Sequence, residues 1–114
     1  MTRRTVAGLS AALAAGDLSS EELVREALAR ADAAAELNAF ITIEPERALA
    51  QARAADRRRH RGDAGPLDGI PIAHKDIFCT NGLRTTCASR MLADFVPPYD
   101  AAVVERLAAA GMIT

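Results

Sequence analysis

The chain has 114 residues, a net charge of −1 and a mean hydropathy of +0.03. This length is enough for one small domain or for part of a larger one, and it excludes a multidomain enzyme. The near-neutral charge provides no global field to gather nucleic acid or anionic lipid. No apolar run approaches the roughly 20 residues of a membrane-spanning helix, so we expect a cytoplasmic protein.

The first 36 residues have helical periodicity. Val6, Leu9 and Leu13 predict a helix that ends at Gly16. Residues 19–22 read Ser-Ser-Glu-Glu, which predicts a capping box in which a serine hydroxyl accepts a backbone N–H and Glu22 reaches back. A second helix therefore begins at this point.

A different pattern follows in residues 37–43. This segment, LNAFITI, is β-branched and aromatic, and it predicts a strand that ends at Glu44-Pro45. Pro45 fits the first turn of a third helix, from Glu46 to about Arg61, which the glycines and proline of residues 62–66 end. A strand between helices predicts an α/β sheet.

The second half of the chain is less regular. Residues 70–74 (IPIAH) predict a buried strand, residues 81–82 (NG) a turn, and residues 84–89 a short extended piece. Asp100 is the predicted N-cap of a helix from Ala101 to Ala110, and Gly111 its stop. The apolar residues 112–114 have the pattern of the first turn of a strand.

Lys75 is the most informative residue of the sequence. It is the single lysine among 14 basic residues, and it directly follows an apolar segment. Arginine stays protonated, whereas a lysine among apolar groups can lose its proton and act as a base. The alternative is that Lys75 is an ordinary solvated charge on the surface. Alternation along a strand places Lys75 on the side of Ala73, with His74 and Asp76 on the other side.

Other polar residues have weaker signals. His74 is either a second titrating group or a hydrogen-bonded structural residue. Cys79 and Cys87 are expected as reduced thiols in core or supporting positions, and no Cys or His pair has metal-site spacing. Five arginines between residues 53 and 61 form either a solvated helix end, which we favour, or a nucleic-acid patch.

Long ordered segments of the chain resemble one known family. They are residues 66–89, which contain GIPIAHKD, CTNG and RTTCAS, then residues 97–101 (PPYDA), with further similarity at residues 19–23 and 37–41. These segments are similar to the amidase signature family, and within it to the A subunits of bacterial glutamyl-tRNA(Gln) amidotransferases. The resemblance implies an α/β fold with helices packed on a mixed β-sheet. In that fold, residues 1–114 are the N-terminal fragment of one amidase domain, with a helical start (1–36) and a strand and helix part (37–114) that carries the lysine motif.

The resemblance also implies a mechanism. The family performs acyl transfer with a Ser, cis-Ser and Lys triad, and its lysine motif corresponds to Lys75, with His74, Asp76 and Ser89 as supporting candidates. Both family serines belong to a Gly/Ser-rich segment that this chain does not contain, since its serines are Ser10, Ser19, Ser20 and Ser89. We therefore expect the chain to be a truncated part of the enzyme and inactive alone.

The same resemblance implies the partners. In such an amidotransferase, a heterotrimer, glutamine is the amide donor, and the ammonia passes to a partner subunit that activates Glu-tRNA(Gln) with ATP and Mg²⁺. This chain is expected to bind no cofactor or metal itself and to have no membrane partner. Two alternatives remain: a stand-alone amidase with another substrate, and a non-catalytic interaction module.

Overall fold

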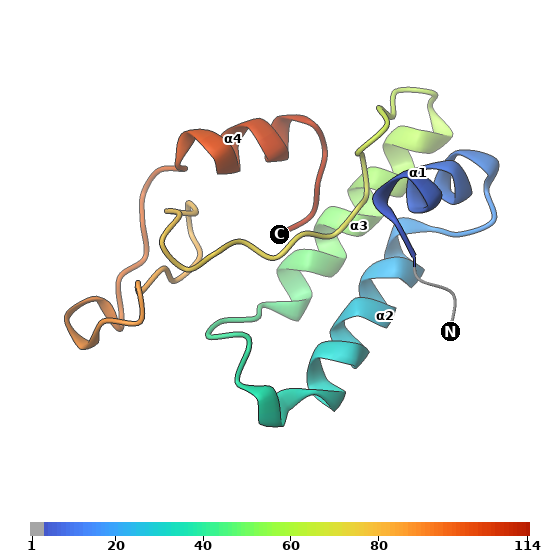
Figure 1. The fold of residues 1–114 in the computed structure, drawn as a ribbon. Helices are drawn as coiled ribbons and strands as arrows, with labels where there is room; N and C mark the ends of the chain where they lie inside the picture. Colours follow the sequence, from blue (N-terminus) through green and yellow to red (C-terminus); the bar gives the residue numbers. More distant parts are fainter. Residues whose placement is uncertain (1–3) are drawn as a thin grey trace.

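The computed structural model describes residues 4–114 of the chain. Figure 1 shows a helical fold in which long loops connect the elements. The elements are α1 (Val6–Ala15), α2 (Ser20–Ala33), the 3₁₀ helix η1 (Ala35–Leu37), α3 (Pro45–His60), the 3₁₀ helix η2 (Arg90–Leu92) and α4 (Ala102–Ala109).

Local signals set the helix ends as the sequence predicts. Gly16 takes the left-handed conformation (φ 77°) after α1, and Asp17 N–H donates to the Ala12 carbonyl, as in a Schellman motif. At the start of α2, Ser19 Oγ accepts from Glu22 N–H at 3.1 Å and the Glu22 carboxylate accepts from Ser19 N–H at 2.9 Å. The capping box is confirmed, and so is the position of Pro45 in the first turn of α3.

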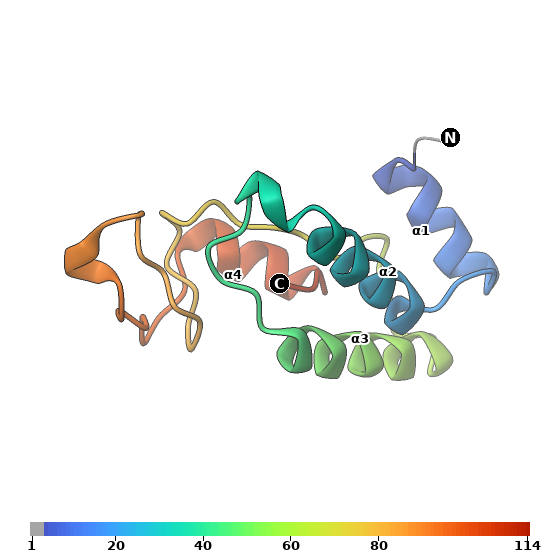
Figure 2. The ribbon, with the colours of Figure 1, turned by 90° about the horizontal axis from the view of Figure 1, so that it is seen from below.

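Helices α2 and α3 lie side by side and form the main core (Figure 2). The cluster between them consists of Val24, Ala48, Leu49, Ala52, Ala55 and Ile113. The small side chains of α3 let the two backbones approach closely. Asp56 of α3 also caps α2, because its carboxylate accepts from the N–H groups of Ser20 at 2.7 Å and Glu21 at 3.1 Å.

A partly buried ion pair between Arg58 and Asp68 stabilises the loop that follows α3. Asp68, which is 4% exposed, accepts two hydrogen bonds from the Arg58 guanidinium, at 2.9 and 2.6 Å. Gly69 follows with φ 86°, and a Cβ at this position would lie 1.9 Å from Ser20 Oγ. The close approach of the loop to α2 therefore requires glycine at position 69.

The predicted sheet is not confirmed. Within residues 4–114, β-pairing is limited to two isolated bridges, a parallel one between Pro71 and Ile113 and an antiparallel one between Thr80 and Leu83. The strand predicted for residues 37–43 is wrong: the segment begins in η1 and continues without a ladder partner. Residues 84–89 form no strand either. A strand depends on neighbouring backbone that supplies hydrogen bonds, and local composition does not specify that neighbour.

The strand start predicted for residues 112–114 is confirmed in part. Ile113 lies beside the segment after Gly69, since Ile113 N–H donates to the Ile70 carbonyl at 3.0 Å and Ile72 N–H to the Ile113 carbonyl at 2.8 Å. Figure 1 shows these two segments close together beside α3, at the C-terminal end of the chain. The extended conformation predicted for residues 112–114 is thus present as one parallel bridge.

The start of α4 corrects a further prediction. Asp100 is not the N-cap: α4 begins at Ala102 with Ala101 as its N-cap, which makes no side-chain cap bond. The Asp100 carboxylate instead accepts from Asn81 N–H at 2.7 Å. The helix ends at Ala109 with Ala110 as its C-cap, and Gly111 follows as the predicted stop, with φ 86° and a bond from Met112 N–H to the Leu107 carbonyl.

In the part of the chain that the structure describes, none of the helices has the length and apolar character required to cross a membrane.

Candidate functional site

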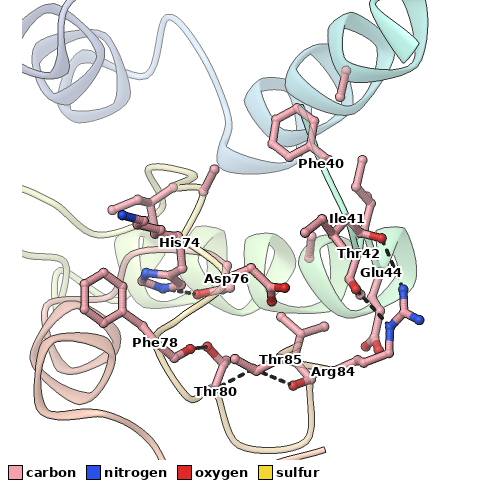
Figure 3. A pocket seen from close by; sticks show the side chains of 18 of the residues that line it. Phe40, Ile41, Thr42, Glu44, His74, Asp76, Phe78, Thr80, Arg84 and Thr85 are labelled. Carbon is pink, nitrogen blue, oxygen red and sulfur yellow. Dashed lines mark hydrogen bonds between the residues drawn. The ribbon is translucent and has the colours of Figure 1, made fainter. Parts of the chain in front are cut away.

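A cavity of about 620 Å³ lies beside the lysine motif. Its walls come from the middle of α2, from Ala48 of α3, and from residues 39–44, 71–78, 80, 83–85, 87–88 and 113–114. Figure 3 shows that side chains from the two sides of the cavity, such as Phe40 and His74, face each other across it. The α2 wall is apolar, formed by Val24, Ala27, Leu28 and Ala31.

Lys75 lines this cavity from an exposed position. Its carbonyl accepts from Phe78 N–H at 3.0 Å, so Lys75 is the first residue of a tight turn. Ala73 and Lys75 are exposed whereas His74 and Asp76 are half-buried, which agrees with the predicted alternation. The structure brings Lys75, His74 and Asp76 together at one wall of the cavity.

His74 has a hydrogen-bonded position. Its Nε2 lies 2.9 Å from Thr114 Oγ1. Burial lowers the pKa of His74 below its ordinary value of 6.5, and the negative charge of Asp100 opposes this shift in part. The contact with Thr114 corresponds to the structural alternative for His74.

Asp76 accepts a set of hydrogen bonds from Thr86. Its carboxylate lies 3.1 Å from Thr86 N and 2.5 Å from Thr86 Oγ1, and its backbone carbonyl accepts from Cys87 N–H at 2.8 Å. Within residues 4–114, the structure contains no ion pair between Asp76 and Lys75. The carboxylate adjacent to Lys75 in the sequence is therefore directed at the loop.

Ser89 lies outside the cavity lining. Its hydroxyl accepts from Met91 N–H at 3.2 Å and caps η2. The structure thus does not bring Ser89 to Lys75. In fact the cavity lining includes none of the four serines of the sequence.

The loop that contains Cys87 has an unusual backbone. Cys87 and Ala88 are consecutive non-glycine residues in the left-handed region, with φ 52° and 55°. Both cysteines are free thiols, as expected, but Cys87 is not in the core, since it is exposed on the cavity wall. Cys79 is half-buried and donates to Tyr99 OH at 3.5 Å, a contact that raises the pKa of Tyr99.

Arg84 and Thr86 shape the site, and the sequence marks them only as part of the family-like segment RTTCAS. Arg84 donates to Thr42 Oγ1 and to the carbonyls of Ile41 and Ala93, each at 3.2 Å, and so joins two walls of the cavity (Figure 3). Thr86 binds Asp76, ten residues earlier in the chain. Neither contact follows from a local spacing rule, because both depend on how distant loops meet.

The arginine-rich end of α3 is engaged in intramolecular contacts. Arg53 pairs with Glu21, Arg58 with Asp68 and Arg61 with Asp63. Arg59 donates to the Asp68 carbonyl at 2.7 Å. These contacts favour the solvated helix end over the nucleic-acid patch.

Residues 4–114 contain no group of three or more His, Cys, Asp or Glu side chains that could hold a metal ion.

Known proteins are similar to this chain in sequence. The Amidase family model matches residues 22–114. The chain is 61% identical to the A subunit of the glutamyl-tRNA(Gln) amidotransferase from Ralstonia nicotianae, with 100% of this chain and 23% of the relative covered. The protein of the same name from Methylococcus capsulatus is 60% identical, with 99% of this chain and 24% of the relative covered. The chain thus spans about a quarter of the length of these curated relatives.

Solved structures resemble the fold closely. The native peptide amidase from Stenotrophomonas maltophilia is 37% identical with a TM-score of 0.92, and the similarity covers 98% of this chain and 24% of that one. An amidase family protein from Bacillus anthracis is 30% identical with a TM-score of 0.87, over 98% of this chain and 23% of that one. Since the family model matches most of the residues and the fold agrees with solved amidases, the chain belongs to the Amidase family.

Proposed function

We propose that this chain is the N-terminal quarter of a cytoplasmic, glutamine-hydrolysing component of an amidotransferase, in which Lys75 is the catalytic base. The observation that carries the proposal is the identity of about 60%, over the whole chain, with relatives named as the A subunits of glutamyl-tRNA(Gln) amidotransferases. The position of Lys75 on the wall of the cavity supports its role.

In the proposed reaction Lys75 acts as the base. Its neutral amine takes a proton, through a bridging serine, from a nucleophilic serine that attacks the glutamine carboxamide carbon. The C–N bond breaks, the proton from Lys75 leaves with ammonia, and an acyl-enzyme remains. Water then hydrolyses this ester to glutamate. Backbone N–H groups stabilise the oxyanion of each tetrahedral intermediate.

Lys75 is exposed in residues 4–114, so the expected apolar surroundings of its amine are not present there, but two other features support the role. No carboxylate of residues 4–114 pairs with its amine, and apolar α2 side chains form part of the cavity wall. Because no serine lines the cavity, both serines of the triad are proposed to come from another segment of the full-length protein. The single domain, with its helical start (1–36) and lysine-containing part (37–114), is part of the same proposal.

The partners follow from the proposed reaction. Ammonia is released beside this segment, and a partner subunit that uses ATP and Mg²⁺ transfers it to Glu-tRNA(Gln). We propose that this chain holds no cofactor or metal and contributes only the lysine side of the glutaminase site. His74 and Asp76 support Lys75 in this proposal, whereas the position of Ser89 at η2 favours no role in the chemistry.

The test compares Lys75 variants of the full-length protein in its complex. Lys75→Ala should lower the rate of ammonia release from glutamine by about 10²- to 10⁴-fold, because proton transfer by a positioned base contributes this much. Lys75→Arg should lose as much, because a guanidinium keeps its proton. Ammonia release is measured directly in a coupled assay.

Two controls accompany these variants. Arg57→Ala, at the end of α3 and outside the cavity lining, should keep the wild-type rate. The 114-residue chain alone should release no ammonia. A Lys75→Ala enzyme with full activity contradicts the proposed role of Lys75, as does activity of the isolated chain.

A stand-alone amidase is the second candidate, favoured by the similarity to the Stenotrophomonas maltophilia peptide amidase. Ammonia release from glutamine that increases when Glu-tRNA(Gln) and ATP are added supports the amidotransferase. Release from a peptide amide by the protein alone supports the stand-alone enzyme. An antibody against residues 1–114 should detect a protein several times larger than 12 kDa, and a product of 12 kDa favours the interaction module instead.

A further inference from the structure

Asp76 is held by the loop that faces it through both its side chain and its backbone. The Thr86 hydroxyl and backbone N–H donate to the carboxylate, and Cys87 N–H donates to the Asp76 carbonyl at 2.8 Å. Thr86 Oγ1 in turn accepts from Ala88 N–H at 3.0 Å. Thr86 is 4% exposed, so these bonds form in a nearly water-free environment where they are strong.

The other side of Lys75 is also anchored. Ile72 N–H donates to the Ile113 carbonyl at 2.8 Å, and the His74 ring contacts Thr114 Oγ1. Lys75 itself has an exposed side chain between these fixed neighbours, at the first position of the turn closed by Phe78 N–H. The backbone around Lys75 is therefore held by the contacts of Ile72 and His74 on one side and by those of Asp76 on the other.

The charge of Asp76 matters as much as its geometry. A carboxylate close to an amine favours the ammonium form, which cannot accept a proton. The Thr86 hydroxyl donates to the Asp76 carboxylate, and in residues 4–114 this carboxylate forms no ion pair with Lys75. The other charged or titratable groups that line the cavity are Glu44, His74, Arg84 and Cys87. Of the charged groups, Asp76 is the direct sequence neighbour of Lys75.

We propose that Asp76 and Thr86 are positioning residues for Lys75: the Thr86 hydroxyl holds the Asp76 carboxylate, which fixes the Lys75 turn and keeps this carboxylate from pairing with the amine. The inference rests on the proposed function of Lys75. It assigns no contact with substrate to either residue, and Thr86 lies outside the cavity lining.

Thr86→Val in the full-length complex tests the proposal, since valine keeps the shape and the backbone N–H and removes the hydroxyl. The kcat for glutamine hydrolysis should fall roughly 10- to 100-fold with KM within about threefold, because the base is misplaced. The acid limb of the pH–rate profile should move to higher pH, because the released carboxylate favours the ammonium form of Lys75. Thr86→Ser, which keeps the hydroxyl, should restore both properties.

Asp76→Asn is the second variant. Its amide oxygen can still accept from Thr86, but it has no negative charge, so the acid limb should stay in place or move to lower pH. An acid limb that moves to higher pH in Thr86→Val but not in Asp76→Asn distinguishes positioning from a merely structural role, which would lower thermal stability alone. Thr5→Val is the matched control: it removes a hydroxyl that accepts from Gly8 N–H at the start of α1, far from the cavity lining, and should lower only the melting temperature.

Certain outcomes overturn the proposal. They are a folded Thr86→Val enzyme with wild-type kcat and pH profile, a Thr86→Ser enzyme as impaired as Thr86→Val, or an Asp76→Asn enzyme with its acid limb at higher pH. The Lys75→Ala enzyme, assayed in parallel, distinguishes a failure of the proposed function from a failure of the positioning role. If it is active, the proposed function is wrong; if it is inactive while Thr86→Val behaves as wild type, only the positioning role is wrong.

Discussion

The backbone next to Lys75 contains two residues in a sparsely populated conformation. Cys87 and Ala88 both have positive φ values, and each such residue costs on the order of 1–3 kcal/mol. The hydrogen bonds from Thr86 and Cys87 to Asp76 hold the loop in this shape. At the scale of single residues, the local geometry of the cavity wall is thus maintained by a hydrogen bond between two side chains and one between two backbone groups.

His74 makes the stability of the protein depend on pH. Burial lowers the pKa of the folded His74 below 6.5, so the unfolded state binds more protons than the folded state as the pH falls through this range. Stability should therefore decrease as the pH drops below about 6.5, until the pH reaches the folded-state pKa. Urea denaturation at several pH values measures this slope.

The variant His74→Gln removes the titrating group and can still contact Thr114 through its amide. Between the unfolded and folded pKa values of His74, the unfolding free energy of this variant should lose the pH dependence that His74 causes in the wild type. An unchanged slope in this variant means that another group causes the pH dependence.

At the scale of elements, α3 stabilises the start of α2. The Asp56 carboxylate accepts from two N–H groups that have no partner within the helix, and its negative charge lies at the positive end of the helix dipole. Asp56→Ala should lower the free energy of unfolding by about 1–2 kcal/mol, as loss of a helix cap does. Chemical denaturation of both proteins measures the difference.

Asp32→Ala is the matched control for this substitution. Asp32 is exposed near the C-terminal end of α2, where a negative charge opposes the dipole. This variant should be neutral or slightly more stable than the wild type. Equal losses in both variants would show that the effect belongs to helix composition and not to the cap.

At the scale of the whole molecule, apolar side chains remain exposed around the cavity. Phe40, Ile41, Ile43 and Ile77 are 44–51% exposed, and all four line the cavity. The isolated 114-residue chain should therefore associate as its concentration increases, because burial of apolar surface is favourable.

Sedimentation velocity over a range of concentrations measures this association. The double variant Phe40→Ser/Ile77→Ser should shift it to higher concentrations, whereas Met91→Ser, which removes an exposed side chain outside the cavity lining, should have a smaller effect. A monodisperse monomer at all concentrations contradicts the expectation and favours a self-sufficient interaction module.

The sequence alone predicts those features that depend on near neighbours in the chain. Gly16 and Gly111 end helices because glycine reaches the left-handed conformation, and Ser19 with Glu22 begins one because its partners are three residues away. The exposure of Lys75 opposite His74 and Asp76 follows from simple alternation. The similarity to the amidase signature family is equally a property of the sequence.

The tertiary structure decides the features in which distant residues meet. Residues 37–43 have strand composition but pair with no other strand among the described residues, and Asp100 binds Asn81 N–H and does not cap the helix that follows it. The contact of Asp76 with Thr86 depends on a loop ten residues away. Local composition determines where a helix begins or ends, whereas a strand, a tertiary cap or a held carboxylate needs a partner that only the folded chain brings within hydrogen-bond distance.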